Sequence, residues 1–181
     1  MMKKMLAFMA ISLCWGLNSS QAQSIHGLSF QDIDGATVNL SSYQGSKLLI
    51  FVAPALQDDR LLKEIDSFQH VYGSKIKMIG VMSYEEGYLD SNKARIKAYY
   101  QSKGVNIVLT AGMHPLTASG SNQSVLFKWL GSRAQNKRFE IDIKRGKYKF
   151  FIDNNGILYS VLPPEVSFFS SLGIQNLNRE F

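Results

Sequence analysis

The side chains best suited to chemistry in this sequence are one cysteine and a small group of charged residues, and the cysteine is the most reactive. A thiolate is a strong nucleophile and a redox centre, so the position of the single thiol decides which reactions are open to the chain. That thiol is Cys14, which lies in an apolar stretch near the amino terminus. Cysteine chemistry therefore depends on whether the finished protein keeps this stretch.

The stretch around Cys14 has the three parts of a secretory signal. Lys3 and Lys4 form a short positive region, an almost entirely apolar run follows, and Ser20 and Ala22 are small residues at the −3 and −1 positions. The apolar run is too short to span a bilayer, which needs roughly 20 residues. We expect export to the periplasm or the extracellular space with cleavage near Ala22, and an uncleaved anchor is the alternative.

The expected mature chain, residues 23–181, contains no cysteine and has the size of one domain. The whole chain carries a formal net charge of +6, of which the leader contributes two charges. No long Lys/Arg block with interleaved aromatic residues accompanies this charge, so we expect no nucleic-acid partner. A domain of this length buries enough surface to fold without a disulfide.

Other catalytic and binding motifs are missing from the sequence. His26, His70 and His114 lack the short spacing of metal ligands, so we expect no metal site. The chain has no G-x-S-x-G nucleophile elbow, no P-loop and no G-x-G-x-x-G motif. We therefore expect neither a serine hydrolase nor a nucleotide cofactor.

Four basic residues, Lys144, Arg145, Lys147 and Lys149, gather at the entry of a predicted strand. Such a cluster can meet an anionic partner, but alternating charge is more often the solvent-facing side of a strand. We therefore interpret the cluster as a solvated face.

Strands and helices alternate along the chain and would position these residues. Residues 48–53 form a continuous apolar run, which is typical of a strand buried on both faces. Apolar residues at three- and four-residue spacing after Asp58 and Asp59 predict a helix that Gly73 ends. The predicted strands span residues 29–33, 37–40, 47–53, 76–82, 105–109, 148–152 and 157–162, and the predicted helices span residues 58–73, 91–103, 123–130 and 166–177. This order predicts an α/β fold with a central mixed sheet.

Two glycine turns close predicted hairpins. Asp34-Gly35 predicts a type I′ turn in an amino-terminal hairpin, and Asn155-Gly156 predicts the turn of a terminal hairpin. No repeat or linker divides residues 23–181, which we expect to form one domain.

Several segments resemble the glutathione peroxidase family, a branch of the thioredoxin-like fold. They keep the family's order and spacing across nearly all of the mature chain. These segments are FQDIDG (30–35), LSSYQG (40–45), LLIFVA (48–53), QSVLFKWL (123–130) and KFFID (149–153), the last followed by Gly156 and Tyr159. The resemblance implies a thioredoxin-like fold with a central mixed sheet flanked by helices and an amino-terminal β-hairpin.

The resemblance also implies where the family's catalytic groups would fall. The family's peroxidatic cysteine falls on Leu56 and its glutamine on Glu85, while Arg145 and Gly146 stand where its tryptophan and asparagine belong. All four functional groups are changed. Leucine has no lone pair to attack a peroxide, so we expect no catalytic residues at these positions.

Glu85 and Glu86 would lie near Arg145 if the family's fold holds. They would then form either a new charged ligand pocket or a solvated loop with ordinary ion pairs, and we favour the loop, in which such pairs contribute about 0–1 kcal/mol.

Together these observations predict an exported, catalytically inactive member of the glutathione peroxidase family. Its role would be to bind a small ligand or protein or to act as a scaffold, without cofactor, metal or membrane span in the mature chain. The alternative is a thiol-dependent peroxidase with an unidentified nucleophile or supplied cofactor. A structural domain of a larger envelope assembly is a third possibility.

Overall fold

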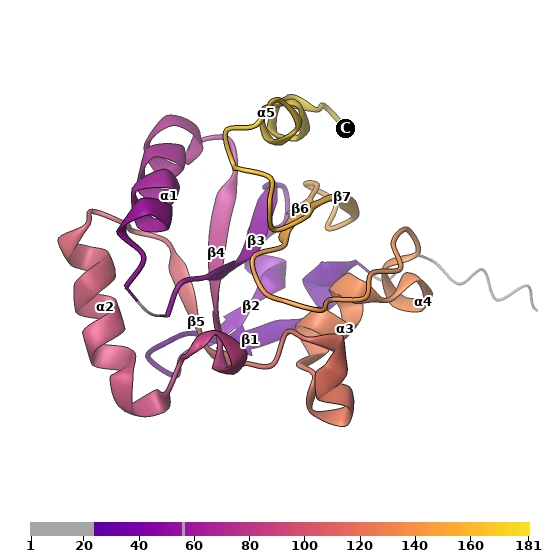
Figure 1. Ribbon diagram of the computed structural model, residues 1–181. Coiled ribbons are helices and arrows are strands. Elements are labelled where there is room, and N and C mark those ends of the chain that lie inside the picture. Colours follow the sequence, from indigo (N-terminus) through magenta and orange to yellow (C-terminus); the bar gives the residue numbers. More distant parts are fainter. Residues whose placement is uncertain (1–23, 56) are drawn as a thin grey trace, which may run out of the picture.

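A five-stranded mixed sheet forms the centre of the computed structural model, which describes residues 24–55 and 57–181 (Figure 1). The predicted leader with Cys14, and Leu56, lie outside the described residues. The strand order is β5-β4-β3-β6-β7. The strands are β3 (Leu48–Ala53), β4 (Lys77–Ser83), β5 (Val108–Met113), β6 (Lys149–Ile152) and β7 (Leu158–Leu162).

Strands β3, β4 and β5 are parallel to one another, and β6 is antiparallel to both of its neighbours, β3 and β7. Strands β1 (Ser29–Gln31) and β2 (Thr37–Asn39) form a separate antiparallel hairpin near the amino terminus. Every residue of β3 and β6 is buried, because helices or loops cover both faces of the sheet. The predicted α/β fold, with a mixed sheet and an amino-terminal hairpin, is confirmed.

The helices divide between the two faces of the sheet. On one face, α1, α2 and α5 pack against alternate strand residues such as Leu49, Phe51 and Phe151. On the other face, α3 and the amino-terminal segment pack against the intervening residues, such as Ile50 and Phe150. The α-helices are α1 (Asp59–Tyr72), α2 (Lys93–Ser102), α3 (Val125–Gly131), α4 (Arg133–Asn136) and α5 (Ser171–Asn178). The 3₁₀ turns are η1 (Ile25–Gly27), η2 (Leu40–Tyr43), η3 (Tyr84–Glu86), η4 (Asp90–Asn92) and η5 (Thr117–Asn122).

Both predicted hairpin turns are present, but the type I′ geometry predicted for Asp34-Gly35 is wrong. Gly35 has a φ of +91°, whereas Asp34 does not have a positive φ. The Asp32 side chain instead accepts hydrogen bonds from the backbone N–H groups of Asp34 and Ala36. An aspartate at the start of the turn therefore holds it by local side-chain bonding. Asp153 makes the same pair of bonds in the second hairpin.

Two element boundaries differ from the sequence prediction. The predicted strand over residues 105–109 begins at Val108 and continues to Met113, because Gly112 and Met113 pair with Met82 and Ser83 of β4. The predicted last helix begins at Ser171 instead of residue 166, and the Ser170 hydroxyl caps it by accepting from Gly173 N–H. Residues 163–170 therefore form an irregular segment that runs beside α1 and contacts it through Glu64 (Figure 1).

Within residues 24–55 and 57–181, no helix has both the length and the apolar character needed to cross a bilayer.

Candidate functional site

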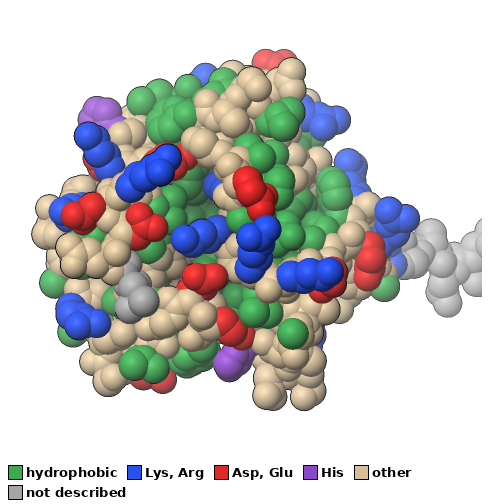
Figure 2. Space-filling view, viewed as in Figure 1, with side chains coloured by type: hydrophobic (Ala, Val, Ile, Leu, Met, Phe, Trp, Pro, Cys, Tyr) green, Lys and Arg blue, Asp and Glu red, His purple; other side chains and the backbone are tan. Residues whose placement is uncertain are grey.

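A pocket of about 320 Å³ opens between the end of β3, the first turns of α1, the start of β6 and residues 164–168. Figure 2 shows this face hollowed, with hydrophobic side chains at the floor and both basic and acidic side chains around the rim. The floor includes Phe51 and Phe168, whose rings meet edge to face with centroids 5.1 Å apart. The sheet and the irregular segment after β7 thus build the pocket from residues more than a hundred positions apart.

Lys149 is the most buried charged residue of the pocket, and only 5% of its surface is exposed. Its ammonium group donates to the backbone carbonyls of Lys147 at 3.3 Å and Pro164 at 3.4 Å, and it lies 5.2 Å from the centre of the Phe168 ring. Both hydrogen bonds are longer than the usual 2.7–3.2 Å. Burial lowers the pKa of Lys149 below its ordinary value, and the negative charges of Glu64 and Glu165 offset part of this effect.

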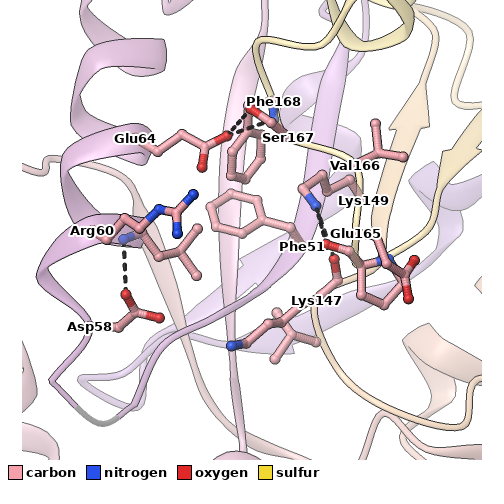
Figure 3. A pocket seen from close by; sticks show the side chains of 13 residues that line it. Phe51, Asp58, Arg60, Glu64, Lys147, Lys149, Glu165, Val166, Ser167 and Phe168 are labelled. Carbon is pink, nitrogen blue, oxygen red and sulfur yellow. Dashed lines mark hydrogen bonds between the residues drawn. The ribbon is translucent and has the colours of Figure 1, made fainter.

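Lys147 has a left-handed backbone conformation, with a φ of +71°. This conformation costs an L-residue roughly 1–2 kcal/mol. It directs the Lys147 carbonyl to the ammonium of Lys149, while the Lys147 side chain points into the pocket (Figure 3). Backbone strain of this kind is often found at functional sites.

Three acidic residues line the pocket, and each already has a partner within the protein. Asp58 caps α1 by accepting from Leu61 N–H at 3.0 Å. Glu64 accepts from the Ser167 hydroxyl at 2.5 Å and from Phe168 N–H at 2.8 Å, which fastens the irregular segment to α1. Glu165 accepts from the Arg145 guanidinium at 2.7 Å.

The basic residues of the pocket are less fully satisfied. Arg60, in the first turn of α1, and Lys147 form no ion pair with any described residue. Figure 3 shows the Arg60 and Lys149 side chains directed into the same space from opposite walls. The site therefore combines bound carboxylates with cations that remain available.

The structure places the predicted site residues in three separate surroundings. Arg145 pairs with Glu165 on the exposed rim, and among the described residues no ion pair joins it to Glu85 or Glu86. Gly146 N–H donates to Glu86 at 3.2 Å, so this pair is brought together from distant parts of the chain. Leu56 lies outside the described residues, and its assignment to the family's nucleophile position stays a prediction.

Glu85 lies in a hydrogen-bonded cluster of its own beyond the end of β4. One oxygen meets His114 Nδ1 at 2.9 Å and accepts from the Ser119 hydroxyl at 2.8 Å, and the other accepts from the Ser83 hydroxyl at 3.0 Å. Burial raises the pKa of the Glu85 carboxyl, but these hydrogen bonds outweigh it, and the pKa is lowered overall. The Glu85 carboxylate therefore has its hydrogen-bond partners within the protein, at one end of the sheet.

The backbone before Leu56 is held in place by α2. The Tyr100 hydroxyl donates to the Pro54 carbonyl at 2.9 Å, and Tyr100 is 2% exposed. Pro54 and Ala55 are also buried. One buried hydrogen bond thus fixes the passage from β3 toward α1.

The interpretation of the basic cluster as a solvated strand face is wrong for Lys149. Lys149 lies in a strand that is paired on both sides, and only 5% of the residue is exposed, at the pocket. Sequence reasoning also missed Arg60 and Glu64 as site residues. The only available signal was their place in the first turns of the helix after β3.

No protein-family model matches the chain, and no curated protein does. Solved structures do match. A protein designated Trgpx, in its apo form, gives a TM-score of 0.61 at 15% identity, with 87% of this chain and 97% of that chain covered. GPX1 of T. cruzi gives 0.61 at 17% identity, with 84% and 92% covered. A thioredoxin-family thiol:disulfide interchange protein from Chlorobium tepidum gives 0.57 at 14% identity, with 87% and 98% covered. These likenesses show that the chain has a thioredoxin-like fold.

Proposed function

We propose that this protein is an exported thioredoxin-fold protein that has lost thiol peroxidase chemistry and binds a ligand in the pocket at the β3–α1 junction. The observation that carries the proposal is a charged pocket at this junction in a mature chain, residues 23–181, that has no cysteine. The resemblance to glutathione peroxidases makes the same junction the place of the lost reaction.

The chemical argument starts from the nucleophile. Peroxide reduction by this family's route needs a thiolate or selenolate to attack an oxygen atom, and the leucine predicted at that position has no electron pair to donate. A pocket is nevertheless present at this junction, and its volume lies at the lower end of the range typical of small-molecule sites. A pocket whose described lining has cations and aromatic rings but no thiol is suited to binding rather than to redox turnover.

Export and a single mature domain are parts of the same proposal. The leader pattern of residues 1–22 supports them, because an amino-terminal positive charge, an apolar run and small residues before Gln23 are typical of a cleaved signal. Mass spectrometry of the protein recovered from the exported fraction tests this part. A mature mass that begins at or near Gln23 is expected, and a mass that includes Cys14 contradicts it.

The central test is a peroxidase assay on the exported protein with hydrogen peroxide or a lipid hydroperoxide and a thiol reductant. We expect no turnover above the buffer blank. Turnover would instead establish the alternative, a peroxidase with an unidentified nucleophile or a supplied cofactor.

A gain-of-thiol experiment tests the position of the lost nucleophile. The Leu56→Cys thiol should react with peroxide faster than the thiol of Val71→Cys, which is a matched control because Val71 is 56% exposed and lies at the far end of α1. Equal reaction rates for the two thiols would contradict the assignment of Leu56 to the nucleophile position.

A further inference from the structure

Among the polar groups that line the pocket, the cationic side chains are the ones with incomplete hydrogen bonding. A lysine ammonium has three N–H donors, and Lys149 uses two of them in long bonds to the Lys147 and Pro164 carbonyls. Only 5% of the residue is exposed, so water can do little to satisfy the third N–H donor. An acceptor inside the pocket would complete its hydrogen bonding.

The charge of that acceptor follows from the state of the other groups. Asp58, Glu64 and Glu165 are each engaged by protein N–H, O–H or guanidinium donors. Arg60 and Lys147 have no ion-pair partner among the described residues. Glu165 is paired with Arg145, which leaves three cations in the site against the charges of Asp58 and Glu64. This excess of one positive charge favours an anion over a cation.

The remaining walls define the rest of the ligand. Phe51 and Phe168 form the floor beside Lys149, and Leu61 and Val166 are half-buried apolar residues of the rim. These surfaces suit a compact apolar or aromatic body attached to the charged group.

On these grounds we propose, resting on the proposed function, that the pocket binds a small organic anion. Its carboxylate or phosphate group accepts from Lys149, with Arg60 and Lys147 beside it, and its apolar body lies against Phe51 and Phe168 (Figure 3).

Probes that share one body and differ in charge test the proposal. Isothermal titration of the exported protein would compare phenylacetate, phenyl phosphate, the neutral phenylacetamide and the cationic 2-phenylethylamine. We expect the two anions to bind and the amide and amine not to bind measurably, and the tighter anion identifies the charged group as carboxylate or phosphate. Preference for the amine, or no binding of either anion at millimolar concentration, overturns the proposal.

Variants assign the binding to named residues. Lys149→Met replaces the side chain by an unbranched one that is one atom shorter and uncharged, so it should weaken binding of the anions about tenfold or more. Lys75→Met is the matched control, because Lys75 is exposed and precedes β4 at the opposite end of the parallel strands. Unchanged affinity in a folded Lys149→Met protein overturns the proposal.

A second variant covers the case in which Lys149→Met does not fold. Arg60→Gln changes an exposed side chain and should weaken anion binding a few-fold without loss of structure. Affinity equal to that of the unaltered protein would contradict the assigned site. The peroxidase assay separates the two proposals, because turnover contradicts the proposed function, whereas failed anion binding without turnover contradicts only the ligand class.

Discussion

Lys149 lies directly opposite Phe51 in the antiparallel ladder between β6 and β3. Opposite residues of such a pair project on the same face of the sheet, so the ladder places an ammonium group beside a ring that is 1% exposed. A charged side chain in this position is desolvated by the fold itself. Its protonation must therefore be coupled to the stability of the protein.

The first prediction concerns this coupling. Because the pKa of Lys149 is lowered in the folded state, the unfolded chain holds a proton that the folded chain has released at pH values between the lowered pKa and 10.5. Lys149 therefore makes stability rise with pH in that window, and its cost is greatest below the lowered pKa. Lys149→Met should remove this rise, so its stability advantage over the unaltered protein should shrink toward pH 10.5.

Urea unfolding from neutral pH to 10.5 measures the difference between the two proteins at each pH. Tyrosine ionisation affects both proteins alike and cancels in the difference. Lys75→Met serves as the control for general charge. A difference that stays constant across the window would show that Lys149 is not coupled to folding.

A second prediction concerns the left-handed backbone of Lys147. Lys147→Gly should raise the free energy of unfolding by about 1 kcal/mol, because glycine adopts a φ of +71° without steric strain. Lys137, which ends α4 with a φ of +63°, offers the matched control. Lys137→Gly should stabilise to a similar extent and leave anion binding unchanged, whereas Lys147→Gly should weaken it. Thermal unfolding and titration with phenylacetate or phenyl phosphate distinguish these outcomes.

A third prediction concerns the bond that holds the end of β3. Tyr100→Phe leaves the buried Pro54 carbonyl without its hydroxyl donor and should lower stability by about 1–3 kcal/mol. Tyr99→Phe removes an exposed hydroxyl bonded to Asp59 and should cost less. Chemical unfolding of the two variants gives the comparison. Equal losses would show that burial does not set the value of the Tyr100 bond.

A fourth prediction concerns Glu85 and the acid side of the stability profile. Its lowered pKa means that the ionised carboxyl stabilises the fold above its ordinary pKa of 4.5, and that this contribution is lost as pH falls through the lowered pKa. Glu85→Gln should therefore cost about 1 kcal/mol at neutral pH and progressively less in acid. Urea unfolding across this range tests it, with exposed Glu180→Gln as the control. A cost that does not change with pH would contradict the prediction.

The sequence predicted the scaffold well because the signals for it are local. A continuous apolar run identified β3, and helical spacing after Asp58 identified α1 together with its cap. The resemblance to glutathione peroxidases carried the fold class. The boundaries of β5 and α5 were less accurate, because pairing with β4 and capping by Ser170 decided them.

The candidate site was harder to predict because its contacts join distant positions. Glu86 accepts a hydrogen bond from Gly146, and Glu64 accepts hydrogen bonds from residues 167 and 168. Neither contact could be predicted from the periodicity of the sequence. Arg145 pairs with Glu165, a partner that the sequence did not suggest. Two of these contacts, Glu64 with residues 167–168 and Arg145 with Glu165, depend on where the segment after β7 lies.

By itself, then, the sequence determined the order of strands and helices and the lack of a thiol in residues 23–181, since composition and local periodicity contain both. Only the tertiary structure decided that Lys149 is a pocket residue. The alternation of Lys147, Tyr148 and Lys149 is that of a solvated strand, but β3, β7 and residues 164–168 surround Lys149 and remove it from water. Burial is a property of the neighbours that folding supplies, and so is the chemistry that burial gives this ammonium group.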